Sequence, residues 1–273
     1  MRHTEIVIAR EAARFVRKDR EKIPLTLGLY ALSLKDRSLG AVARASYFLL
    51  RHLDDILDEE RPVDEDPVKY AQDLQEQIET GDYDPSNPIA QLPKFAIPIL
   101  ESKASTDDNP RHDFVKAIDA LIFDYWRRQE RRPLSETELD NYYHEVLDPG
   151  LNLMLIGFDS AMRVRDIPGY SPSLGRLYSI RDLRKDWRLG IVNIPQRVLK
   201  YFGLNSNSPF DEVVSNIGVR PWIRREVELG TRGLIGIQRG LASLDESLTK
   251  KVLTGFANSA IKSASKRELE LFQ

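Results

Sequence analysis

The sequence predicts an all-α fold, and three observations support this prediction. Apolar residues recur with helical spacing along most of the 273 residues. No two neighbouring stretches show the strict alternation of apolar and polar residues that marks paired strands. Internal repeats, low-complexity tracts and shifts in composition are all lacking. We therefore expect one helical domain over residues 1–273, with a central cavity.

The composition is that of a globular protein in water. Charged residues make up 30% of the chain and hydrophobic residues 41%, with a formal net charge of −2. This charge gives no indication of a nucleic-acid partner or of an anionic membrane surface. Cysteine is absent, which excludes disulfides, thiolate zinc sites and cysteine nucleophiles.

The N-terminus and the apolar runs of the sequence indicate where the protein is located. The N-terminus is charged from the start and has no apolar signal region. The longest apolar runs are far shorter than the ~20 residues needed to span a bilayer. We expect a cytoplasmic protein without a transmembrane segment, although an apolar substrate could still draw it to membranes. The sequence leaves open whether it is a monomer or a homodimer.

Helical periodicity and the positions of Pro and Gly define the expected helices. They cover residues 4–21, 25–34, 39–60, 67–80, 89–102, 111–131, 135–163, 173–190, 195–203, 209–217, 220–246 and 248–269. Ser38 is a candidate N-cap, and Ser135 with Glu138 forms a capping-box pattern. We expect the helix 89–102 to be broken or kinked at Pro93 and Pro98, and the helix 135–163 to be interrupted at residues 148–150.

The first acidic motif lies near the end of the expected helix 39–60. Asp54 and Asp58 are four residues apart, which places both carboxylates on one helical face. Asp55 lies beside them, and Arg51 is one turn earlier. Carboxylate oxygens are ligands for Mg²⁺, which is often shared with substrate phosphates. The alternative is an acidic helix end that faces solvent.

The second acidic motif repeats this pattern. Asp182 and Asp186 are again four residues apart, and Arg181 precedes the first of them. Two such faces in one helical chain could form the walls of a cleft and hold a diphosphate between bound metals. The alternative is a mixed-charge surface helix with ordinary salt bridges.

Taken together, these motifs resemble the squalene/phytoene synthase family, the head-to-head branch of the all-α isoprenoid synthases. The resemblance covers about residues 25–200. Its first part is the stretch from Tyr47 through Arg51 to Asp58, and its last part is Arg181-Asp182-x-x-x-Asp186 followed by Gly190 and Pro195. Between them, residues 114–143 resemble the segment that leads to the family's Tyr-Cys-x-x-Val-Ala-Gly.

The resemblance implies a set of site residues. The implied Mg²⁺ ligands are Asp54, Asp55, Asp58, Asp182 and Asp186. The implied diphosphate-binding residues are Arg51, Arg181 and Arg37. Tyr47 and Tyr142 match family tyrosines near the reacting carbons, and Asp54 and Asp182 share the catalytic role of ionising the donor. The alternative for each tyrosine is an ordinary core aromatic residue.

The chain also departs from the family pattern. Residues 146–150 read Val-Leu-Asp-Pro-Gly where the family has Val-Ala-Gly-x-Val-Gly, which suggests a reshaped cavity around Leu147. Gly175 and Tyr178 replace a Gln and an Asn. The Gly-Arg-x-Tyr-x-Pro loop has become residues 190–195, Gly-Ile-Val-Asn-Ile-Pro.

From these departures we expect a divergent prenyltransferase. It would ionise an allylic prenyl diphosphate and transfer the prenyl group to a small, aromatic acceptor, as the carbazole prenyltransferases of this family do. His52 and His144 are candidate bases by their proximity to the motifs. The alternatives are a head-to-head synthase that joins two prenyl diphosphates, a terpene cyclase, and a non-catalytic family member.

Overall fold

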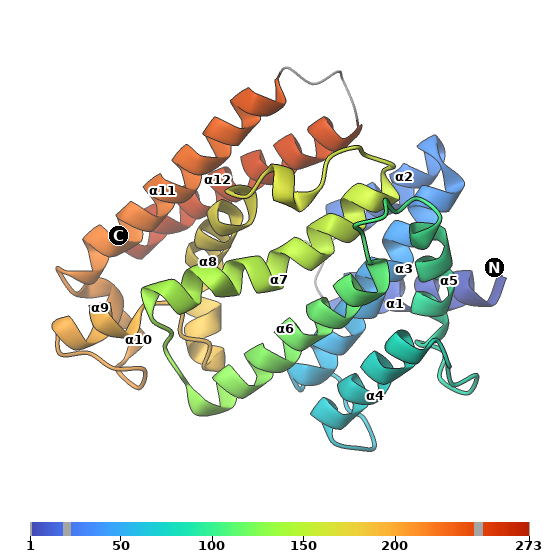
Figure 1. The fold of residues 1–273 in the computed structure, drawn as a ribbon. Coiled ribbons are helices and arrows are strands. Elements are labelled where there is room, and N and C mark those ends of the chain that lie inside the picture. The colour runs from blue at the N-terminus through green and yellow to red at the C-terminus, as the bar shows by residue number, and fades with distance from the viewer. Residues whose placement is uncertain (1, 19–22, 243–247, 273) are drawn as a thin grey trace. The chain divides into compact units, whose positions relative to one another are not determined.

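The computed structural model describes residues 2–18, 23–242 and 248–272 (Figure 1). Within these ranges the chain forms twelve α-helices and no strand, which confirms the all-α prediction. The chain divides into two compact units. Unit 1 contains residues 1–122 and 149–162, and unit 2 contains residues 123–148 and 163–273. The expectation of one domain over residues 1–273 stays a prediction.

Unit 1 is built around one long helix. Its helices are α1 (Arg2–Lys18), α2 (Ile23–Lys35), α3 (Arg37–Leu57), α4 (Pro67–Thr80), α5 (Gln91–Glu101) and most of α6 (Pro110–Glu130). Helix α3 packs against α1, α2, α4 and α5 (Figure 1). More than half of its residues are buried, including Phe48, Leu49 and Leu53. The first acidic motif therefore lies at the C-terminal end of a helix that packs against four other helices.

The start of α3 differs from the prediction. Asp36, not Ser38, is the N-cap, because its carboxylate accepts a hydrogen bond from the backbone N–H of Leu39 at 3.0 Å. Both residue types can cap a helix, and the choice depends on which one has extended backbone angles. Helix α4 matches its expected bounds, with Asp66 as N-cap and Gly81 in the left-handed conformation at its end.

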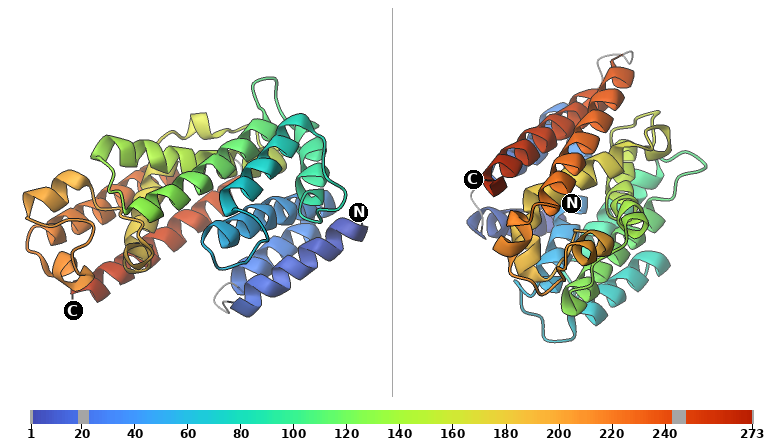
Figure 2. Two further views of the ribbon diagram at one scale, coloured as in Figure 1. Left: turned by 90° about the horizontal axis from the view of Figure 1, so that it is seen from below. Right: turned by 90° about the vertical axis from the view of Figure 1, so that its left-hand side faces the viewer.

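Unit 2 is built around α8 (Tyr170–Leu189), which carries the second acidic motif. Its other helices are α9 (Gln196–Tyr201), α10 (Phe210–Ser215), α11 (Val219–Leu241) and α12 (Leu248–Phe272), with the short 3₁₀ helix η2 (Val164–Asp166). Helices α11 and α12 form a long hairpin, and both pack against α8 (Figure 2). The expected helical residues 19–21 and 243–246 lie outside the described residues.

The expected interruption at residues 148–150 is wrong, because α7 (Glu136–Gly157) runs through Pro149 as one helix. Helix α5 likewise runs through Pro98 without a break. A proline removes one backbone hydrogen bond, and packing of the flanking apolar residues offsets this cost. The capping box at the start of α7 is confirmed. Ser135 Oγ accepts from the N–H of Glu138 at 3.2 Å, and Glu138 Oε2 accepts from the N–H of Ser135 at 2.8 Å.

Among the described residues, no helix is both long enough and apolar enough to cross a bilayer.

Candidate functional site

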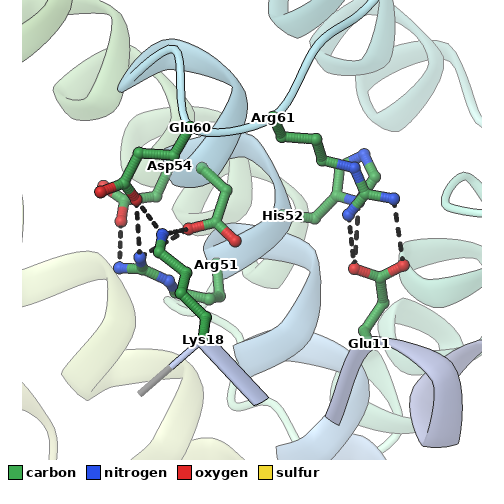
Figure 3. Close-up of polar contacts among 8 residues, drawn as sticks. Glu11, Lys18, Arg51, His52, Asp54, Glu60 and Arg61 are labelled. Carbon is green, nitrogen blue, oxygen red and sulfur yellow. Dashed lines mark hydrogen bonds and ion pairs between the residues drawn. The ribbon is translucent and has the colours of Figure 1, made fainter. Parts of the chain in front are cut away.

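The first acidic motif is neutralised by two cations in unit 1. Arg51 donates to Asp54 and, at 2.5 Å, to Asp55 Oδ1 (Figure 3). Lys18, the last residue of α1, donates to the same Asp55 oxygen at 2.7 Å and also forms an ion pair with Glu60. Asp55 is buried, whereas Asp54 is about one-third exposed. A bound metal ion would compete with Arg51 and Lys18 for the carboxylates, and a bound diphosphate would compete with the carboxylates for these two cations.

The other implied residues of α3 lie at different distances from this cluster. Asp58 is the C-cap of α3, and its backbone N–H donates to the carbonyl of Asp54 at 2.8 Å. Arg37 is the first residue of the same helix. At 1.5 Å per residue its backbone is about 25 Å from that of Asp54. The structure therefore does not bring Arg37 to the first acidic motif.

Tyr47 belongs to an aromatic cluster on the buried side of α3. Its ring contacts Phe15 and Phe48 edge to face, with ring centroids 5.6 and 5.3 Å apart. Burial raises the pKa of its hydroxyl, so Tyr47 is neutral at physiological pH. The guanidinium of Arg51 lies 5.6 Å from the Phe15 ring. The aromatic cluster thus lies directly beside the cation that neutralises the motif.

His52 belongs to a buried network on the other side of α3. Its Nδ1 lies 3.4 Å from Glu11, and its Nε2 lies 3.2 Å from the Tyr70 hydroxyl. Arg61 donates to Glu11 at 2.6 Å (Figure 3). Burial opposes ionisation of Glu11, but the hydrogen bonds from His52 and Arg61 lower its pKa to about 2. Burial also lowers the pKa of His52. This network ties α1 to α3 and accounts for His52 structurally.

The second acidic motif lies in unit 2. Arg181 donates to Asp182, with Nε 3.0 Å from Oδ1 and Nη2 2.5 Å from Oδ2. The Arg181 guanidinium also lies over the Tyr178 ring, 4.2 Å from its centroid. Asp182 is more than one-third exposed, so this pair can be reached by solvent and ligands.

Asp186 is held differently, by a neutral amide. Asn193 Nδ2 donates to Asp186 Oδ2 at 3.0 Å, and Asn193 Oδ1 accepts from Arg127 at 3.0 Å. Burial, together with the neighbouring carboxylates of Asp182 and Asp124, raises the pKa of Asp186 to about 8. Asp124 in turn accepts from the Tyr142 hydroxyl at 2.7 Å. Three carboxylates are thus close enough to disfavour one another's charge.

The chemistry of this carboxylate group fits a divalent cation. Mutual repulsion and burial leave Asp186 short of positive charge, which a bound cation would supply. The donor set consists of carboxylate oxygens, as Mg²⁺ requires. In the described part of the chain, no group of three or more acidic or histidine side chains is already arranged as a metal site. The residues therefore suit the ion chemically, without a preformed cage.

One departure from the family pattern, Gly175, has a structural explanation. A Cβ atom at Gly175 would lie 2.3 Å from the ring of Tyr143, so that ring occupies the space where the family's Gln would begin. Tyr143 is buried in a cluster with Leu134, Leu139 and Tyr142. His144 interacts with Asp148 one turn later at 2.8 Å, on a half-exposed part of α7.

Comparison with known proteins decides the family. The family model for squalene/phytoene synthase matches residues 29–260. The chain belongs to the squalene/phytoene synthase family. Its fold is similar to that in the crystal structure of squalene synthase HpnC from Alicyclobacillus acidocaldarius, with a TM-score of 0.70 and 18% sequence identity. The match covers 98% of this chain and 94% of that one. A search of curated proteins finds no match.

Family membership confirms the resemblance stated from the motifs and supports a prenyl-transferring enzyme of isoprenoid biosynthesis. The structure adds residues that sequence reasoning did not single out as functional. These are Lys18, Glu60, Asp124, Arg127 and Asn193. Asp124 and Arg127 are one helical turn apart beside the motif-bearing helix, and that spacing is the only sequence signal for them.

Proposed function

We propose that this protein ionises an allylic prenyl diphosphate with the help of Mg²⁺ and uses the resulting cation to form a carbon–carbon bond. The observation that carries the proposal is the pair of acidic motifs, each on a helix with an arginine in contact with its first aspartate. A family model that spans residues 29–260 supports the same chemistry.

In this proposal both motifs act on one diphosphate. Asp54, Asp55 and Asp58 are the ligands from α3, and Asp182 and Asp186 are those from α8. When bound, Mg²⁺ supplies the positive charge that makes diphosphate a good leaving group. Ligand binding by the carboxylates releases Arg51 and Arg181 from their present ion pairs, and both guanidinium groups then donate to diphosphate oxygens.

The cation that remains after ionisation needs an apolar, electron-rich environment. Tyr47 and Tyr142 are the proposed catalytic aromatics, since ring faces attract a cation by ~0.5–2 kcal/mol. One face of Tyr142 already packs against Arg127, whose guanidinium carbon lies 4.5 Å from the ring centroid.

The first candidate for the acceptor is a second prenyl diphosphate, joined head to head. Family membership and the fold shared with a squalene synthase support this candidate. The second candidate is a small aromatic molecule. It is favoured by the altered loop at residues 190–195 and by the space at Gly175 that Tyr143 fills, since both remove polar side chains of the family pattern.

The test is incubation of the full chain with Mg²⁺ and C5, C10, C15 or C20 allylic diphosphates, one at a time and without acceptor. Diphosphate release and product mass are recorded. A C30 or C40 product supports head-to-head coupling, and a cyclic product of the donor's own carbon number supports a cyclase. Donor binding that requires Mg²⁺ but gives little turnover directs the search to aromatic acceptors. Absence of both binding and release would contradict the proposal and favour a non-catalytic family member.

A further inference from the structure

A fully buried arginine organises the surroundings of the second acidic motif. The Arg127 side chain is 1% exposed. Its Nη2 donates to the carbonyl of Val192 at 3.1 Å and to Asn193 Oδ1 at 3.0 Å, and its Nη1 donates to Asp124 at 3.2 Å. The guanidinium also packs over the Tyr142 ring. A buried charge is costly unless it is paired and hydrogen-bonded, so these partners hold the side chain in one place.

Arg127 fixes which way the amide of Asn193 points. Arginine carries only donors, so the amide atom that faces Arg127 must be the oxygen. The amide nitrogen must then point away from Arg127, and it lies 3.0 Å from Asp186 Oδ2. Asn193 is itself 3% exposed, so solvent has little access to this contact. The relay Arg127–Asn193–Asp186 therefore has one orientation.

The backbone that carries Asn193 is held at the same place. Gly190 ends α8 with a φ of 94°, and the N–H of Ile191 donates to the carbonyl of Asp186 at 2.9 Å. A Cβ at Gly190 would lie 2.6 Å from the carbonyl oxygen of Arg128. The connection between α8 and α9 thus turns directly against residues 127 and 128 of α6.

A neutral donor has a different consequence from a cationic one. In the first acidic motif, Lys18 and Arg51 contact Asp55 directly and neutralise its charge. Asn193 orients Asp186 without adding a positive charge. Arg127 hydrogen-bonds the amide and not Asp186 itself, and its charge offsets only part of what raises the pKa of Asp186. The Asn193 amide therefore holds one oxygen of Asp186 in place. This contact does not neutralise the negative charge of the Asp186 carboxylate.

We propose that Asn193 and Arg127 are positioning residues that hold the carboxylate of Asp186 in the orientation needed for cation binding. This inference rests on the proposed metal-binding role of Asp186. Residues that hydrogen-bond a metal ligand fix its direction, and their loss typically weakens metal affinity ~10–100-fold. Asn193 stands where the family pattern has a tyrosine, so the relay is a property of this chain.

The test measures binding of Mn²⁺ to the full chain in the presence of inorganic diphosphate, by electron paramagnetic resonance of the free ion. Asn193→Ala should weaken Mn²⁺ binding by about tenfold. Arg127→Lys keeps the charge but loses the planar fork, and it should weaken binding in the same direction. Asn141→Ala, on an exposed part of α7, is the matched control and should bind as the wild type does.

Three outcomes separate this inference from the proposed function. Wild-type Mn²⁺ affinity in both Asn193→Ala and Arg127→Lys would overturn the inference. If Asp186→Asn loses Mn²⁺ binding but Asn193→Ala and Arg127→Lys do not, the positioning role is overturned and the metal-binding role of Asp186 stands. Wild-type affinity in Asp186→Asn would overturn the metal-binding role itself. Thermal unfolding without metal accompanies each titration, and an affinity loss measured far below the melting temperature is not explained by unfolding. If Asn193→Ala does not fold, Arg127→Lys decides.

Discussion

Tyr142 donates its hydroxyl hydrogen to Asp124 across 2.7 Å, which links α7 to α6 inside unit 2. The same carboxylate accepts from Arg127, and Arg127 packs over the Tyr142 ring. Burial and the negative charge of Asp124 raise the pKa of the Tyr142 hydroxyl. The tyrosine is therefore a neutral donor to Asp124, and the three side chains form one interacting group.

This group predicts coupling between Tyr142 and Asp124. Tyr142→Phe should lower the free energy of unfolding by about 1–2 kcal/mol, because a buried hydrogen bond is lost. Asp124→Asn should also destabilise, and the double variant should lose less than the sum of the two. Urea denaturation of the four proteins gives the interaction free energy. Additive losses would contradict the coupling. Tyr201→Phe, at an 82% exposed residue, is the control.

The pKa of Asp186 predicts how stability depends on pH. Its folded-state pKa of about 8 lies above the usual value for aspartate, so the folded protein binds more protons than the unfolded one between these values. The free energy of unfolding should therefore contain a contribution that falls as pH rises from about 4 to about 8. Asp186→Asn removes this contribution and should be more stable than the wild type at pH 9, on the order of 6 kcal/mol.

Urea denaturation without metal, at pH 5 and pH 9, checks this prediction. The stability difference between Asp186→Asn and the wild type should be larger at pH 9. A difference that is equal at both pH values would mean that Asp186 is ionised throughout this range.

Glu11 gives a prediction of the opposite sign. Its pKa of about 2 lies below the usual value, so its contribution to stability is present above about pH 4.5 and is lost as pH falls toward 2. Glu11→Gln should destabilise the protein by ~3 kcal/mol at pH 7, because Arg61 loses its buried partner. Thermal or urea unfolding measures the loss, with Glu79→Gln on an exposed face of α4 as control. Equal stability of wild type and Glu11→Gln at pH 7 would contradict this account.

The close approach at Gly175 predicts a steric effect. A methyl group there would meet the buried Tyr143 ring at 2.3 Å, so Gly175→Ala should destabilise by about 1–3 kcal/mol. Gly255 lies on α12 with no atom within 4 Å of an added Cβ. Gly255→Ala should therefore stabilise, by up to ~1 kcal/mol, through helix propensity. Calorimetric melting of both variants tests the contrast, and equal shifts in melting temperature would contradict the packing at Gly175.

Local signals in the sequence predicted much of the fold. Pro67 and Gly81 fixed the bounds of α4, and Ser135 with Glu138 fixed the start of α7, because each signal acts within a few residues. The continuity of α7 through Pro149 was not predictable in this way. A proline inside a helix costs free energy, and whether the helix continues depends on tertiary packing. The local sequence carries no information on that packing.

The candidate site was predictable only in part for a related reason. The acidic motifs follow from the i, i+4 spacing on one helix. The partners of these motifs come from distant parts of the chain. Lys18 is 37 residues from Asp55, and Arg127 is 66 residues from Asn193. No local pattern marks either pair, so sequence reasoning found the carboxylates and missed the side chains that hold them.

We propose that the two acidic motifs bind Mg²⁺ and ionise one prenyl diphosphate. The most direct measurement is Mg²⁺-dependent diphosphate release by the wild type, Asp54→Asn and Asp182→Asn, with circular dichroism to establish that each variant is folded. Asp73→Asn on an exposed face of α4 serves as control. The account predicts at least a hundredfold loss of release in each motif variant, about 3 kcal/mol of transition-state stabilisation, with the fold retained. Wild-type release by either motif variant would contradict it.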